Sequence, residues 1–146
     1  IYSGGGNMPE ILHTLRIAGK RRVVYRAITE QDGLRGWWTR FTMAEPTVGY
    51  VNEFGFGGTF KFRMRIDDLE QDELVEWTCI DGHEEWEGTR IRFVLSDSDD
   101  SKGTSVKFEH IGWWRDDGVL ASCSYDWAQY LRSLKLYVEQ GQGTPS

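Results

Sequence analysis

The chain has 146 residues, of which 27% are charged and 39% hydrophobic, and its formal net charge is −6. This size and composition fit one globular domain that can fold without disulfides or a structural metal. The acidic balance argues against nucleic-acid binding, and no apolar run is long enough to predict a membrane-spanning helix. Aromatic residues reach 14%, with seven tryptophans, which indicates a large interior surface or a lined pocket.

The ends of the chain are expected to lie outside the fold. Residues 1–7, IYSGGGN, precede Met8 and look like a non-native leader. The domain is then expected to span 8–143, with 144–146 as a tail. Because no signal-peptide pattern is recognisable, the sequence predicts a cytoplasmic protein if Met8 is the native start.

A strand and two short helices are predicted first. Residues 9–17 alternate in polarity, as in a strand with one buried face. Residues 20–28 carry apolar side chains at helical spacing, namely Val23, Val24, Ala27 and Ile28. A second helix is expected to start after Thr29, a candidate N-cap with Asp32 three positions on.

The first of two GWW tripeptides ends this second helix. Trp37 and Trp38 follow Leu34 by three and four positions, so at least one indole should point with Leu34 into the core. Residues 41–57 then indicate one or two short strands among loops.

Four alternating stretches follow, at 59–66, 74–80, 89–95 and 104–111, separated by polar turns. Each has one apolar and one mostly charged face, which predicts an antiparallel meander. The expected inward residues are Phe60, Phe62, Met64 and Ile66, then Val75, Trp77 and Cys79, then Ile91, Phe93 and Leu95, and finally Val106, Phe108 and His110.

The last element is a long helix over about 119–139, capped by Asp116 or Asp117 and stopped by Gly141. Its apolar stripe consists of Cys123, Trp127, Tyr130, Leu131, Leu134 and Val138. Sheet and helix each have one apolar face and can cover one another. Since a strongly twisted sheet does not close flat on one helix, we expect a cavity between them, lined by aromatic rings.

Several stretches resemble a known family: VVYRAITEQDGLRGWWT, GGTFKFRM, VEWTCIDG, GTSVKFEHIGW and WAQYLRSLKLYVEQGQG. They are similar to the activator of heat-shock-protein-90 ATPase homologue-like family, a branch of the START-like or SRPBCC superfamily that includes polyketide cyclases and birch-pollen-allergen-type proteins. The resemblance runs from about Pro9 to Gly143. It implies an α+β helix-grip fold, in which a curved antiparallel sheet of about seven strands wraps around the C-terminal helix and leaves a pocket for an apolar ligand. It also implies that Trp37 and Trp38 seal the sheet, and that Trp113 and Trp114 lie near the cavity mouth.

The candidate ligand-binding residues are Trp77, His110, Trp114, Trp127, Phe60, Phe62, Phe108 and Cys123. His110 shares the inward parity of Val106 and Phe108, and three roles stay open for it. It can be a hydrogen-bonded structural residue, a ligand contact, or a general acid/base with Tyr125 as partner.

Three further patterns have simpler explanations than a site. The turn DGHEEWEG holds His83 among acids, but adjacent residues on a hairpin turn splay apart, so we expect no metal there. The thiols Cys79 and Cys123 lie in apolar patterns without a CxxC motif and should be buried. The basic stripe on the charged face, Lys61, Arg63, Arg65, Arg90, Arg92 and Lys107, is expected to form cross-strand ion pairs, with Glu76 between two of the strands.

The sequence therefore supports three functions. The first is a cytoplasmic module that holds a hydrophobic or aromatic small molecule, without a cofactor, as a monomer or homodimer. The second is a cyclase- or dehydratase-like enzyme that uses the same cavity. The third, taken from the family's name-giving members, is an interaction module for a chaperone-like protein partner.

Overall fold

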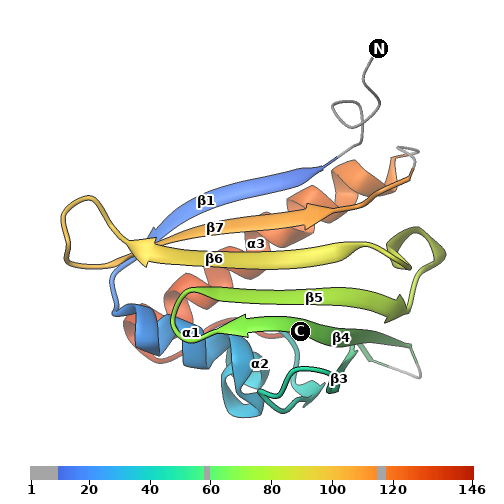
Figure 1. Cartoon of the computed structure of the whole chain (residues 1–146), viewed down its shortest axis with the longest axis horizontal. Helices are drawn as coiled ribbons and strands as arrows, with labels where there is room; N and C mark the ends of the chain where they lie inside the picture. The colour runs from blue at the N-terminus through green and yellow to red at the C-terminus, as the bar shows by residue number, and fades with distance from the viewer. Residues whose placement is uncertain (1–9, 58–59, 115–117) are drawn as a thin grey trace.

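The structure is a computed structural model, and it describes residues 10–57, 60–114 and 118–146. Within these residues, seven strands form one antiparallel sheet in the order β1-β7-β6-β5-β4-β3-β2. The strands are β1 (Ile11–Ile17), β2 (Phe41–Met43), β3 (Val51–Gly55), β4 (Lys61–Glu70), β5 (Leu74–Asp81), β6 (Arg90–Asp97) and β7 (Thr104–Ile111). The predicted meander is confirmed, because β4 to β7 are neighbours in chain order (Figure 1).

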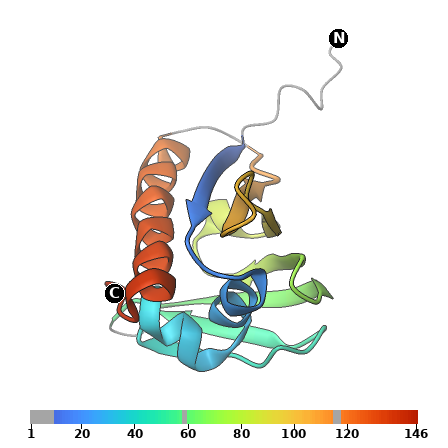
Figure 2. The ribbon, with the colours of Figure 1, turned by 90° about the vertical axis from the view of Figure 1, so that its left-hand side faces the viewer.

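The helices cover one face of this sheet. α1 (Arg21–Thr29) and α2 (Gln31–Trp37) follow β1, η2 (Glu84–Trp86) is a short 3-10 turn between β5 and β6, and α3 (Val119–Gln140) ends the fold. Figure 2 shows α3 lying along one side of the curved sheet, with α1 and α2 towards its C-terminal end. This is the predicted helix-grip arrangement. No helix in the described part of the chain is long and apolar enough to cross a membrane.

The alternation of the strands decides which side chains face α3. Each inward residue predicted for β4 to β7 is buried, whereas Phe60, just before β4, is 37% exposed. Register shifts in the β4–β5 pair after Arg63 and after Ile66 add bends to the sheet. The buried face therefore curves around the helix.

The centre between sheet and helix is filled. The Trp38 ring lies 4.3 Å from Phe54, 5.1 Å from Trp127 and 6.1 Å from Trp77, measured between ring centroids. Trp37 is equally buried, and its Nε1 donates to the carbonyl oxygen of Ala27 at 2.8 Å. Both indoles of the first GWW doublet therefore belong to the core, and the cavity expected between sheet and helix does not lie at this point.

The helix starts differ from the sequence expectation. Thr29 is the last residue of α1 and not an N-cap, because its hydroxyl donates to the Tyr25 carbonyl at 2.7 Å, one turn back. Glu30 stands at the N-cap of α2 and makes no side-chain cap bond. Val23, expected on the buried face, is 43% exposed, and Tyr25 is buried in α1 instead. The caps Asp116 and Asp117 proposed for α3 lie outside the described residues, while Gly141 ends α3 in the left-handed conformation, as predicted.

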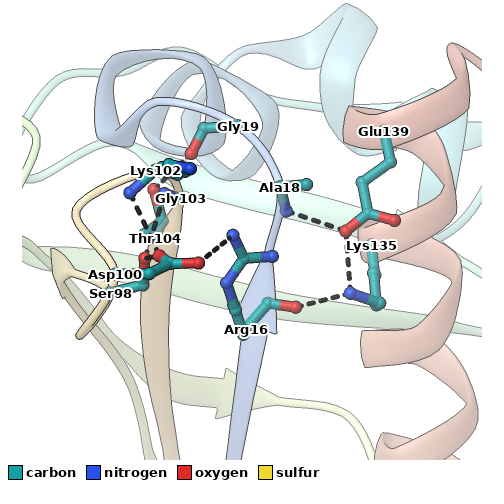
Figure 3. Close-up of polar contacts among 10 residues, drawn as sticks. All are labelled: Arg16, Ala18, Gly19, Ser98, Asp100, Lys102, Gly103, Thr104, Lys135 and Glu139. Atoms are coloured by element: carbon teal, nitrogen blue, oxygen red, sulfur yellow. Dashed lines mark hydrogen bonds and ion pairs between the residues drawn. The ribbon is translucent and has the colours of Figure 1, made fainter.

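A polar network fixes the C-terminal half of α3 to the sheet (Figure 3). Lys135 Nζ donates to the backbone oxygen of Arg16 at 2.6 Å and pairs with Glu139 Oε2 at 2.7 Å. The same carboxylate oxygen accepts the Ala18 amide at 2.8 Å. Arg16 in turn pairs with Asp100 at 2.8 Å on the turn between β6 and β7. This end of the helix is therefore held by two α3 side chains that bind backbone atoms at the end of β1.

The charged face of the sheet is paired across strands as expected at some positions, whereas Arg65 pairs with Asp67 on its own strand. Arg92 contacts Glu76 on β5 at 2.7 Å and Glu109 on β7 at 3.4 Å, and the register places these residues opposite one another. Lys61 and Arg63 both pair with Glu53 on β3, a partner that the sequence did not indicate.

Candidate functional site

A cavity of about 350 Å³ lies at the end of the sheet opposite the polar network, between the start of β4, η2 and the N-terminal half of α3. We refer to it as the end cavity. It is lined by Phe56, Phe60, Phe62, His83, Trp86, Val119, Ser122, Cys123, Asp126, Trp127 and Tyr130. Most of this wall is aromatic.

Local sequence patterns explain how each wall forms. The helix contributes residues 119, 122, 123, 126, 127 and 130, which is the spacing of one face of an α-helix. Phe60 and Phe62 share the inward parity of β4. The turn after β5 forms the third wall, and it needs Gly82. The φ of this glycine is +149°, and a Cβ added to it would lie 2.5 Å from the Phe62 ring. The glycine lets the turn after β5 pass directly over Phe62.

Four of the residues expected to bind a ligand are brought together here. Phe60, Phe62, Cys123 and Trp127 all line the end cavity. Cys123 accepts a hydrogen bond from Trp86 Nε1 at 3.2 Å, and burial is the main reason that its thiol pKa is raised. Its thiol is therefore neutral at pH 7 and a poor nucleophile.

The other four do not line the end cavity. Trp77 and Phe108 are fully buried in the filled core, where Phe108 packs 4.4 Å from Trp127, and neither lines the cavity. Trp114 is 54% exposed and does not line it either, because Gly112 turns the chain at φ +87° as it leaves β7. Trp113 is the buried member of the second GWW doublet, and its Nε1 donates to the backbone oxygen of His110 at 3.0 Å.

His110 is a structural residue in this arrangement. Trp127 Nε1 can only donate, so at 3.1 Å it requires an unprotonated His110 Nδ1. The Thr89 hydroxyl gives its single proton to the Trp86 carbonyl, so it accepts from His110 Nε2 at 2.8 Å. The imidazole is therefore neutral and both of its nitrogens are engaged. Burial lowers its pKa from 6.5 to about 3.

The acid/base role proposed for His110 is not supported by this geometry. A general base needs a free lone pair that reaches the substrate, and His110 lies behind the Trp86 and Trp127 rings. Tyr125, its suggested partner, is 67% exposed and outside the cavity wall. The two residues therefore do not form a catalytic pair.

Sequence reasoning missed Trp86, which it left in a solvated acidic turn. In the structure η2 folds the turn back, so that Trp86 is buried with its ring 4.2 Å from Phe62 and 4.7 Å from His110. A tryptophan among four acids and two glycines was the available signal, since a large ring gains little in a solvated turn. Within the described residues no group of three metal-ligating side chains is found, at this turn or elsewhere.

Comparison with known proteins agrees with the fold. A family profile described as "Activator of Hsp90 ATPase homolog 1-like protein" matches residues 18–139. The chain belongs to this family. The sequence expectation of that family and of the helix-grip fold is thereby confirmed.

Similar solved structures include a family relative and more distant proteins. The Aha1 dimer from Colwellia psychrerythraea has 32% sequence identity and a TM-score of 0.84, with 93% of this chain and 100% of that chain covered. A protein from Staphylococcus saprophyticus has 18% identity and a TM-score of 0.78, covering 94% and 98%. A putative protein from the dynemicin biosynthetic locus has 18% identity and a TM-score of 0.76, covering 92% of this chain and 48% of its own. At these lower identities the likeness concerns the fold. A search of curated proteins gave no match to the chain.

Proposed function

We propose that this family member binds an apolar small molecule in the end cavity. The observation that carries the proposal is the open volume of about 350 Å³ beside a core that is otherwise filled. Protein interiors are packed as densely as organic crystals, so an aromatic wall without a partner is stable only where other interactions hold it open. This volume lies at the lower end of the roughly 300–1,000 Å³ that ligand pockets span.

The affinity to expect from such a cavity is modest. A ligand that buries about 200 Å² of apolar surface gains about 5 kcal/mol at ~25 cal/mol per Å². That gain corresponds to a dissociation constant on the order of 10⁻⁴ M before the entropic cost of binding is counted. Shape and polar contacts must supply any tighter binding, which makes the chemistry of the wall decisive.

A matched pair of variants tests the proposal. Ser122 is exposed at the cavity border, and Ser122→Phe should place a ring in the opening, whereas Ala121→Phe adds the same ring to a neighbouring exposed position outside the wall. We expect the neutral fluorescent probe N-phenyl-1-naphthylamine to bind the wild type and the Ala121→Phe variant saturably, and the Ser122→Phe variant at least tenfold more weakly. Equal binding by all three proteins, or no saturable binding at all, would reject the cavity as the site.

Self-association is a second function that specific observations support. The 32% identical relative is described as a dimer. In this chain β2 is a sheet edge, and its outward residues Phe41 and Met43 are 65% and 54% exposed. We infer that a second copy of the chain covers this edge, and the Discussion gives the test. The chaperone-directed role stays a prediction of the sequence.

A further inference from the structure

The charge at the wall of the end cavity is negative. Asp126 lines it, whereas no lysine or arginine does among the described residues. Asp126 is half-buried, and its carboxylate makes no hydrogen bond or ion pair with the described part of the chain. An acid at the border of an apolar cavity without a cationic partner is unusual, because partial desolvation is costly for a charge.

The field of this carboxylate reaches into the cavity. It contributes, after burial itself, to the raised pKa values of Tyr130 and Cys123, which are also cavity residues. The negative charge of Asp126 is therefore felt by two other residues of the cavity wall.

The aromatic rings of the wall also favour a positively charged ligand. The Trp86 and Trp127 indoles are nearly parallel, with an interplanar angle of 22° and centroids 6.2 Å apart. Tyr130 stands at 88° to Trp127 with its centroid 5.5 Å away. All three rings belong to the cavity wall, and aromatic rings attract cations, indole most of all.

We propose that the end cavity selects a monocationic ligand, with a compact ammonium or quaternary ammonium group beside Asp126 and the two indoles, and an apolar body against Phe60 and Phe62. The inference rests on the proposed function, since it names the ligand class of the same cavity. A neutral ligand would strip water from Asp126 without compensation, and an anion would be repelled by its carboxylate. A cation offsets the desolvation of Asp126 and is attracted to the aromatic wall.

Two ligands of the same shape distinguish the contribution of charge to binding from that of apolar contact. The first is (3-hydroxyphenyl)trimethylammonium, and the second is 3-tert-butylphenol, in which carbon replaces the charged nitrogen. Both are titrated at pH 6.5 and low salt, by displacement of N-phenyl-1-naphthylamine and by calorimetry. We expect the cation to bind at least about tenfold more tightly, a preference that weakens as salt is added.

Two charge variants test whether Asp126 causes the preference for the cation. Asp126→Asn should reduce the gap, which is the ratio of the dissociation constants of the two ligands, at least fivefold. Asp99→Asn makes the same change in net charge at the turn between β6 and β7, the opposite end of β6 from the cavity, and should leave the gap unchanged. Thermal melting of both variants checks that each is folded, and the ligand pair on the wild type is decisive even without them.

Each outcome decides between the two proposals. If 3-tert-butylphenol binds as well as the cation or better, the cation preference is wrong while apolar binding stands. If neither ligand nor the naphthylamine probe binds, the cavity function fails as a whole. If Asp99→Asn narrows the gap as much as Asp126→Asn, overall charge explains the preference and the site assignment is overturned.

Discussion

Replacement of His110 by glutamine tests the buried hydrogen-bond network and the absence of an acid/base role in one experiment. The glutamine amide can both accept and donate hydrogen bonds, as the neutral imidazole does, but it has no titratable group. At pH 7.5 the variant should be about 1–3 kcal/mol less stable, because the altered geometry leaves Trp127 Nε1 or Thr89 without a good partner. Stability at lower pH then distinguishes a neutral histidine from a protonated one.

The size of the pH effect follows from the pKa values. His110 has a pKa of about 3 in the folded chain and 6.5 when solvated. Below pH 6.5 the unfolded chain therefore takes up a proton that the folded chain refuses, so the free energy of unfolding falls as the pH falls. At pH 5 the loss is about 2 kcal/mol. Any folded-state pKa below about 4 gives nearly the same loss at pH 5, since the unfolded state alone is then titrating.

The assay is urea unfolding followed by tryptophan fluorescence at pH 7.5 and pH 5.0. We expect the wild type to lose about 2 kcal/mol more than His110→Gln between these two values. The variant His83→Gln changes an exposed histidine and keeps His110, so it should follow the wild type. Equal pH dependence in the wild type and His110→Gln would show that the buried imidazole accepts a proton in the folded state, which would refute the network and reopen the acid/base role.

Three further predictions concern the fold and the assembly. Gly33→Ala should destabilise the chain by about 1–3 kcal/mol in urea unfolding, because the new Cβ would lie 2.7 Å from the backbone of Ala27, which cannot move aside; unchanged stability would contradict the close packing of α1 and α2. Glu139→Gln should lower stability at pH 7 but not at pH 3, since the contacts with the Ala18 amide and Lys135 lower the pKa of this carboxyl and their contribution is lost as it is protonated; an equal loss at both values would contradict the ionic anchor. Phe41→Lys should convert a dimer into a monomer in light scattering at micromolar concentration, and a wild-type chain that is monomeric at every concentration tested would reject self-association through β2.

The proposals of ligand class and of self-association use separate parts of the molecule. The end cavity lies beside η2 and the start of α3, whereas the apolar edge is β2, at the end of the strand order. A variant at Phe41 should therefore leave ligand binding intact, and one at Ser122 should leave the oligomeric state intact. The two readouts can be measured on the same three proteins, the wild type, Phe41→Lys and Ser122→Phe.

Periodicity in the sequence determined the sheet and the long helix. Inward residues such as Met64, Phe93 and Val106 were predicted from a repeat of two, and the α3 stripe of Cys123 and Trp127 from a repeat of 3.6. These predictions hold because the direction of each Cβ depends only on the local backbone conformation. The family was indicated by the resemblance of five sequence stretches to it, and this too is a property of the sequence.

Tertiary packing decided which inward residues border open space. Trp77 and Trp127 have equal claims by periodicity, yet the ring of Trp38 closes the space over Trp77, while Trp127 reaches the wall of the end cavity. Periodicity specifies a face, but the volume left over depends on rings that arrive from distant parts of the chain. No local sequence pattern predicts that volume.

The role of His110 and the position of Trp86 were likewise set by long-range contacts. Parity placed His110 inside but could not name its partners, which come from Thr89 and from Trp127 on α3. The acidic turn that holds Trp86 has the composition of a solvated loop, and it folds back because the ring gains more by packing on Phe62 and bonding Cys123 than the turn loses. The sequence by itself therefore determined which faces are apolar, and the three-dimensional fold decided which of those faces meet, because contact between distant segments depends on shape rather than on local periodicity.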